Sequence, residues 1–162
     1  MKMKKLGRTG LMVTENSFGA LPIQRIDQKS AVELLHMAYD AGINYYDTAR
    51  AYTDSEEKLG ETFKGGLRQN IIIASKTMST DRAGAERDIE TSLRNLQTDY
   101  IDIYQMHNLQ ALQDPDDDSS ALFALMQAKK AGKIRHVSFT AHRHDIAEQG
   151  IQSGLFDTLQ FP

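Results

Sequence analysis

Short apolar runs alternate with longer amphipathic stretches along most of the chain. The apolar runs are bounded by polar residues and predict strands at 16–21, 43–48, 70–76, 100–106, 135–140 and 158–161. The stretches between them place apolar residues three or four positions apart and predict helices at 28–41, 55–64, 81–96, 121–131 and 146–153. Regular succession of strand, helix and strand is typical of parallel strands joined by crossover helices.

A small hairpin is predicted ahead of this pattern, within residues 1–15. Its two apolar segments, 3–6 and 11–13, flank a Gly-Arg-Thr-Gly sequence whose glycines ease a turn. Asp27 is placed to cap the first helix, and Gly42 stands where that helix should end. Local signals therefore agree with the hydrophobic pattern.

The pattern favours a (β/α)8 barrel, here incomplete, because each strand and helix unit is about 30 residues long and no Gly-x-Gly-x-x-Gly follows a strand. We expect one domain over residues 1–162, with about six of the eight strands and five helices. A barrel left at six strands exposes apolar faces and two unpaired edges. We therefore expect a fragment of a longer protein, or a chain that associates with itself through these edges.

Composition narrows the possible functions. The chain has 19 Lys and Arg against 22 Asp and Glu, a net charge of −3 that argues against a nucleic-acid surface. It has no Cys, which excludes disulfides, thiolate-held metals and thiol nucleophiles. The basic start lacks the apolar core of a signal peptide, and no stretch approaches the roughly 20 apolar residues of a membrane span. We expect a cytoplasmic protein without nucleic-acid or membrane partners.

Four polar residues mark one end of the predicted barrel. Asp47, Lys76 and His107 end the second, third and fourth strands, and Tyr52 follows Asp47 in the next loop. Reactive groups of such barrels gather at the carboxyl ends of the strands. Lys76 would lower the pKa of the Tyr52 phenol, Asp47 would hold Lys76, and His107 would orient a carbonyl oxygen. These four groups suit a reaction in which a carbonyl oxygen is protonated while a hydride is transferred to the carbonyl carbon.

The chain resembles the aldo-keto reductase family over its whole length. The opening segments 6–11 and 17–19 are similar to that family's floor hairpin and first strand. The motif residues, in order, are Gly42-Ile43-Asn44-Tyr45-Tyr46-Asp47-Thr48-Ala49, Ala51-Tyr52, Ser55-Glu56, Leu59-Gly60, Ser75-Lys76, Asp99 to Asp102 and Met106-His107.

The resemblance implies an NADPH-dependent reductase of aldehydes or ketones, with a small-molecule carbonyl substrate and no metal. Position by position, it makes Tyr52 the general acid, Lys76 the group that lowers its pKa, Asp47 the support of Lys76, and His107 the group that orients the carbonyl.

Cofactor contacts implied by the resemblance come from several strand ends. Gly19 and Ala20 follow the first strand, Asp47 the second, and Gln160 lies in the sixth. The family usually has a Ser-Asn pair after the fifth strand, where this chain has Thr140 and then an alanine. The family's nicotinamide-stacking aromatic in strand seven and its 2′-phosphate site in strand eight have no counterpart in these residues.

Two other functions remain open from the sequence. His107, His142 and His144, with Asp47 nearby, allow a metal-dependent barrel hydrolase. A non-catalytic nucleotide-binding or scaffold module is the second alternative, because one barrel fold serves many functions.

Overall fold

A computed structural model describes all of residues 1–162. The centre is a six-stranded parallel sheet in the order β3-β4-β5-β6-β7-β8, which follows the order of the chain. Its strands are β3 (Phe18–Gly19), β4 (Tyr45–Asp47), β5 (Ile72–Thr77), β6 (Ile101–Met106), β7 (Ile134–Thr140) and β8 (Thr158–Gln160). The expected incomplete parallel barrel is confirmed.

Five α-helices connect the strands. They are α1 (Gln28–Asp40), α2 (Ser55–Phe63), α3 (Arg82–Asn95), α4 (Ala121–Lys130) and α5 (His144–Ser153). The Asp27 side chain accepts a hydrogen bond from Ser30 N at 2.9 Å and caps α1 as predicted. Gly42 follows the end of this helix with φ +91°, a conformation that glycine adopts without strain.

The start of the sheet differs from the sequence prediction. The first strand is shorter than the expected 16–21, because the 3₁₀ helix η1 (Pro22–Arg25) begins soon after it. A second 3₁₀ turn, η2 (Arg68–Asn70), occupies the position where the third strand was expected to start. Proline favours the first turn of a helix, since it has no backbone N–H to lose there.

The hydrophobic core has two unequal parts. A cluster of 29 buried residues fills the space between the sheet and the helices. A cluster of four lies on the other face of the sheet: Val13, Ile72, Ala74 and Ile103. Alternation along the strands separates the two, so that Ile72 and Ala74 face the smaller cluster while Ile73 faces the helices.

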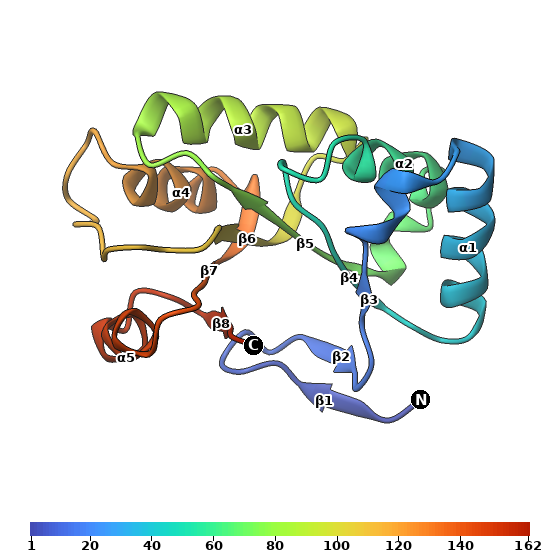
Figure 1. Ribbon diagram of the computed structural model, residues 1–162, viewed down its shortest axis with the longest axis horizontal. Helices are drawn as coiled ribbons and strands as arrows, with labels where there is room; N and C mark the ends of the chain where they lie inside the picture. Colours follow the sequence, from blue (N-terminus) through green and yellow to red (C-terminus); the bar gives the residue numbers. More distant parts are fainter.

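The predicted amino-terminal hairpin forms from β1 (Met3–Lys5) and β2 (Met12–Thr14). Figure 1 shows it on the side of the sheet opposite α3. Arg8 in its turn donates to the carbonyl oxygens of Gly154 and Phe156 at 2.5 and 2.6 Å. Thr14 N donates to Asn44 Oδ1 at 2.8 Å. These hydrogen bonds therefore join the hairpin to the segments just before β8 and β4.

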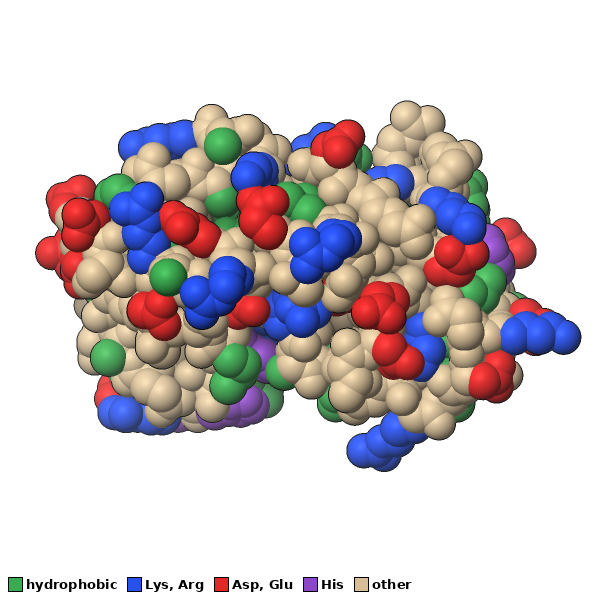
Figure 2. Space-filling view, turned by 90° about the horizontal axis from the view of Figure 1, so that it is seen from above, with side chains coloured by type: hydrophobic (Ala, Val, Ile, Leu, Met, Phe, Trp, Pro, Cys, Tyr) green, Lys and Arg blue, Asp and Glu red, His purple; other side chains and the backbone are tan.

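The surface shows no concentration of one charge on its helical side. Figure 2 shows acidic and basic side chains interspersed over the face seen from above. No helix is long and apolar enough to cross a membrane.

Candidate active site

A buried ion pair joins the ends of β4 and β5. Lys76 Nζ donates to Asp47 Oδ1 at 2.5 Å and to the carbonyl oxygen of Thr48 at 2.8 Å. The Lys76 side chain is only 2% exposed. Burial lowers the pKa of Lys76, and the charge and hydrogen bond of Asp47 oppose that change. The predicted support of Lys76 by Asp47 is present in the geometry.

Tyr52 lies over this pair from the loop between β4 and α2. Lys76 Nζ is 5.1 Å from the centre of the Tyr52 ring. Tyr52 N donates to Ala49 O at 3.0 Å, and Ser55 N donates to Tyr52 O at 2.9 Å, so the loop is a hydrogen-bonded turn. Three of the four side chains expected at this end of the barrel, Asp47, Lys76 and Tyr52, therefore lie close together.

The pKa of Tyr52 differs from the sequence expectation. Burial raises it, and the nearby negative charge of Asp47 raises it further. The expectation was that Lys76 lowers this pKa. The ammonium group donates its hydrogen bonds to Asp47 and to the Thr48 carbonyl, and none to Tyr52.

His107 completes the cluster from the end of β6. Its ring meets the Tyr52 ring edge to face, with centroids 5.9 Å apart. Burial and the charge of Lys76 lower the pKa of His107 below its ordinary value of 6.5, so the imidazole is neutral at pH 7. Its Nδ1 atom is buried and has no hydrogen-bond partner. The residue as a whole is half-buried, and a neutral, partly accessible ring fits hydrogen bonding to a ligand.

The expected cofactor residues lie along the same end of the sheet. Gly19 is the parallel neighbour of Asp47, and Thr140 is the parallel neighbour of Gln160. A side chain added at Gly19 would meet no atom within 4 Å, so this position is open. Gln160 is exposed. These residues fit a flat ligand that carries an amide, as nicotinamide does.

Two of the expected contacts are altered by the structure. The Thr140 hydroxyl accepts from Asn108 N at 2.6 Å, which leaves its hydrogen and one lone pair for a further partner. Ala20 is fully buried, its N–H donates to Asp47 O at 2.8 Å, and its carbonyl accepts from Ser55 Oγ at 2.9 Å. Ala20 therefore presents no surface to a cofactor.

The histidines of the hydrolase alternative do not assemble. His142 and His144 are exposed, and the His144 ring packs 5.1 Å from the Phe161 ring. The chain contains no group of three or more His, Cys, Asp or Glu side chains that could hold a metal ion. The structure therefore offers no set of metal ligands for the hydrolase alternative.

Sequence reasoning gave no role to several polar residues around the cluster. Gln105 Nε2 donates to Asp47 Oδ2 at 3.1 Å. The fully buried Glu56 accepts from Ser75 Oγ at 2.6 Å and from Arg50 Nη1 at 2.5 Å, and it thereby links the Tyr52 loop to β5. A glutamine near the end of a buried strand, two residues before His107, was the available signal for the first contact.

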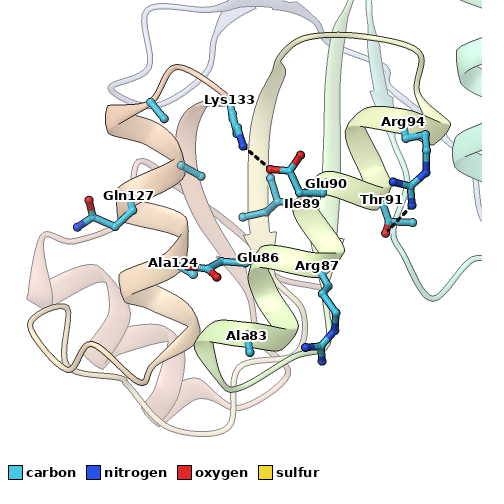
Figure 3. Close-up of a pocket in the computed structure, with 12 residues that line it drawn as sticks. Ala83, Glu86, Arg87, Ile89, Glu90, Thr91, Arg94, Ala124, Gln127 and Lys133 are labelled. Carbon is cyan, nitrogen blue, oxygen red and sulfur yellow. Dashed lines mark hydrogen bonds and ion pairs between the residues drawn. The ribbon is translucent and has the colours of Figure 1, made fainter.

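One hollow of the surface lies away from this cluster. It is a groove between α3 and α4, where Glu90 pairs with Lys133 (Figure 3). None of the four clustered residues lines it. Position at the carboxyl ends of the strands, and not depth, marks the candidate site.

Comparison with known proteins decides the family. The model of the aldo/keto reductase family matches residues 10–153. The chain belongs to the aldo/keto reductase family. Aldo-keto reductase YhdN of Bacillus subtilis is 34% identical over 132 residues, which cover 74% of this chain and 40% of that protein. L-galactose dehydrogenase of Arabidopsis thaliana is 32% identical over 162 residues, which cover 90% of this chain and 50% of that protein.

Solved aldo-keto reductases share the fold. The structure of an aldo-keto reductase from Klebsiella pneumoniae in complex with NADPH matches with a TM-score of 0.79 and 26% identity, covering 94% of this chain and 54% of that one. The expected family and barrel type are confirmed. The chain spans about half the length of the curated relatives it matches.

Proposed function

We propose that this aldo/keto reductase is an NADPH-dependent enzyme that reduces an aldehyde or ketone, with Tyr52 as the general acid. The observation that carries the proposal is the convergence of Asp47, Lys76, Tyr52 and His107 at the carboxyl ends of neighbouring strands. Membership of the family supports the oxidoreductase class. NADPH in a solved relative supports the choice of cofactor.

The cofactor, when bound, supplies hydride to the carbonyl carbon. The chain supplies the proton: Tyr52 Oη gives its hydrogen to the carbonyl oxygen, and the products are an alcohol and the oxidised nicotinamide. The raised pKa of Tyr52 keeps the phenol protonated at neutral pH. Lys76, 5.1 Å from the ring centre, stabilises the phenolate as it forms.

The remaining residues orient the reactants. His107 is neutral and half-buried, and it donates a hydrogen bond to the carbonyl oxygen without competing as an acid. Thr140 and Gln160 are the neighbours that would hold the carboxamide of the nicotinamide, and Gly19 leaves space beside Asp47. The preferred carbonyl compound is a small molecule that reaches this end of the sheet.

The test compares the chain with two tyrosine variants. NADPH binding is followed by fluorescence, and reduction of a panel of aldehydes and ketones by the loss of NADPH absorbance. Tyr52→Phe should retain binding and lose at least about 100-fold in turnover, the usual contribution of a positioned acid. Tyr39→Phe, on α1, is the control and should retain both. Turnover retained by Tyr52→Phe would refute the acid assignment, and NADPH binding without any reduction would favour the non-catalytic alternative.

A further inference from the structure

Gln105 occupies the position in the sheet that faces both members of the buried ion pair. It is the parallel neighbour of Lys76 in the pairing of β5 with β6. Its side chain is buried, with the residue 2% exposed, and Nε2 donates to Asp47 Oδ2 at 3.1 Å. Asp47 is thus held at both oxygens, by Lys76 at Oδ1 and by Gln105 at Oδ2.

A carboxylate held at one oxygen is free to turn about its terminal bond, whereas one held at both is not. The amide of Gln105 fixes the rotation that points Oδ1 at Lys76. Gln105 therefore influences the position of Asp47 without carrying a charge itself.

The ionisable groups around Asp47 come from every neighbouring element. Lys76 comes from β5, Tyr52 from the loop before α2, His107 from the end of β6, and Tyr45 from β4 itself. None of them contacts Asp47 Oδ2 through a hydrogen bond, which is made by Gln105 alone. No other group in the chain replaces this contact.

We propose that Gln105 is a positioning residue of the catalytic cluster: its amide orients Asp47, and through Asp47 it holds the Lys76 ammonium group beside Tyr52. This role rests on the proposed reductase function. The contacts from which it is inferred are made within the chain itself, without a ligand. The pKa values of Lys76 and Tyr52 therefore report on it independently of turnover.

Loss of the amide and general loosening of the site would shift the pKa of Lys76 in opposite directions, and only loosening would lower the pKa of Tyr52. Burial lowers the pKa of Lys76 and raises that of Tyr52, and Asp47 keeps the first from falling further. If Gln105 orients Asp47, its removal weakens the ion pair and lowers the pKa of Lys76 further. If Gln105 only fills space, its removal admits water, and both pKa values return toward their ordinary values of 10.5 for Lys76 and 10.0 for Tyr52.

The experiment uses Gln105→Met, which removes the amide and keeps a side chain of similar length. The pKa of Lys76 is measured by nuclear magnetic resonance of its ε-carbon, assigned with Lys76→Met, and that of Tyr52 from its ζ-carbon, assigned with Tyr52→Phe. Ser138→Ala is the matched control, because Ser138 is the β7 neighbour of Gln105, is fully buried and donates to Thr158 O at 2.6 Å.

We expect Gln105→Met to lower the pKa of Lys76 without lowering that of Tyr52, and Ser138→Ala to leave both unchanged. A Lys76 pKa that stays constant or rises, or a Tyr52 pKa that falls, would overturn the proposal. Neither titration needs cofactor or substrate, so failure of the chain to bind NADPH or to reduce a carbonyl would count against the proposed function only.

A second measurement tests the proposal if Gln105→Met does not fold. In the unchanged chain, one side-chain amide hydrogen of Gln105 should exchange with solvent much more slowly than those of the exposed Gln149, because a carboxylate holds it. Asp47→Leu should speed that exchange. Gln105 amide hydrogens that exchange as fast as those of Gln149, or a rate unaffected by Asp47→Leu, would also overturn the proposal.

Discussion

Removal of Lys76 alone should destabilise the fold more than removal of the whole ion pair. Lys76→Met leaves the Asp47 carboxylate buried without its cation and deprives the Thr48 carbonyl of a donor at 2.8 Å. Breaking a buried pair from one side costs about 3–5 kcal/mol. Because Gln105 still donates to Asp47, we expect the lower end of this range, about 3 kcal/mol.

The assay is the free energy of unfolding in urea for a double-mutant cycle. Asp47→Asn combined with Lys76→Met leaves no uncompensated charge, so the double variant should recover a coupling energy of about 2 kcal/mol relative to the sum of the single variants. Lys64→Met is the control, since Lys64 is half exposed and pairs at the surface with Glu61. The reasoning would be refuted if Lys76→Met were no more costly than Lys64→Met, or if the single effects simply added.

Three further outcomes follow from packing, burial and the sheet edges. A Cβ at Gly60 would lie 2.2 Å from Asn95 O, so Gly60→Ala should cost about 1–3 kcal/mol in urea unfolding rather than give the usual gain of about 1 kcal/mol in a helix; a stabilised variant would contradict the close approach of α2 and α3. Burial raises the pKa of Tyr104, so the folded chain keeps this proton above pH 10 where the unfolded chain ionises. The stability it supports is complete below that pH and falls as the pH rises; Tyr104→Phe should flatten this alkaline loss in unfolding curves, and an unchanged slope would count against it. The edge strands β3 and β8 each pair on one side only, so the 162-residue chain should sediment as an associated species, whereas a uniform monomer would disprove that expectation.

Much of the fold follows from local signals in the sequence. Asp27 and Gly42 bound a helix whose apolar positions recur at helical spacing, and the isoleucines of β5 form an unmistakable buried strand. The order of the strands then follows from parallel crossover connections. By contrast, the short first strand depends on where Pro22 starts a 3₁₀ turn, which hydrophobic periodicity does not record.

The candidate site was predictable in its members but not in its electrostatics. The strand ends place Asp47, Lys76 and His107 together, because parallel strands end on one side of the sheet. The direction of the Tyr52 pKa was not predictable, since burial is the sum of contributions from many elements. The contact of Gln105 with Asp47 depends on the register of strands separated by β5, and a sequence does not reveal that register.

The most direct test of the proposed function is the transfer of a labelled hydride. The protein is incubated with a carbonyl substrate and with NADPH that carries deuterium at the transferable position of the nicotinamide, and the alcohol is examined by mass spectrometry. The account predicts deuterium on the former carbonyl carbon, and loss of this product in Tyr52→Phe. An alcohol without deuterium, or NADPH bound with no labelled product from any aldehyde or ketone of the panel, would contradict it.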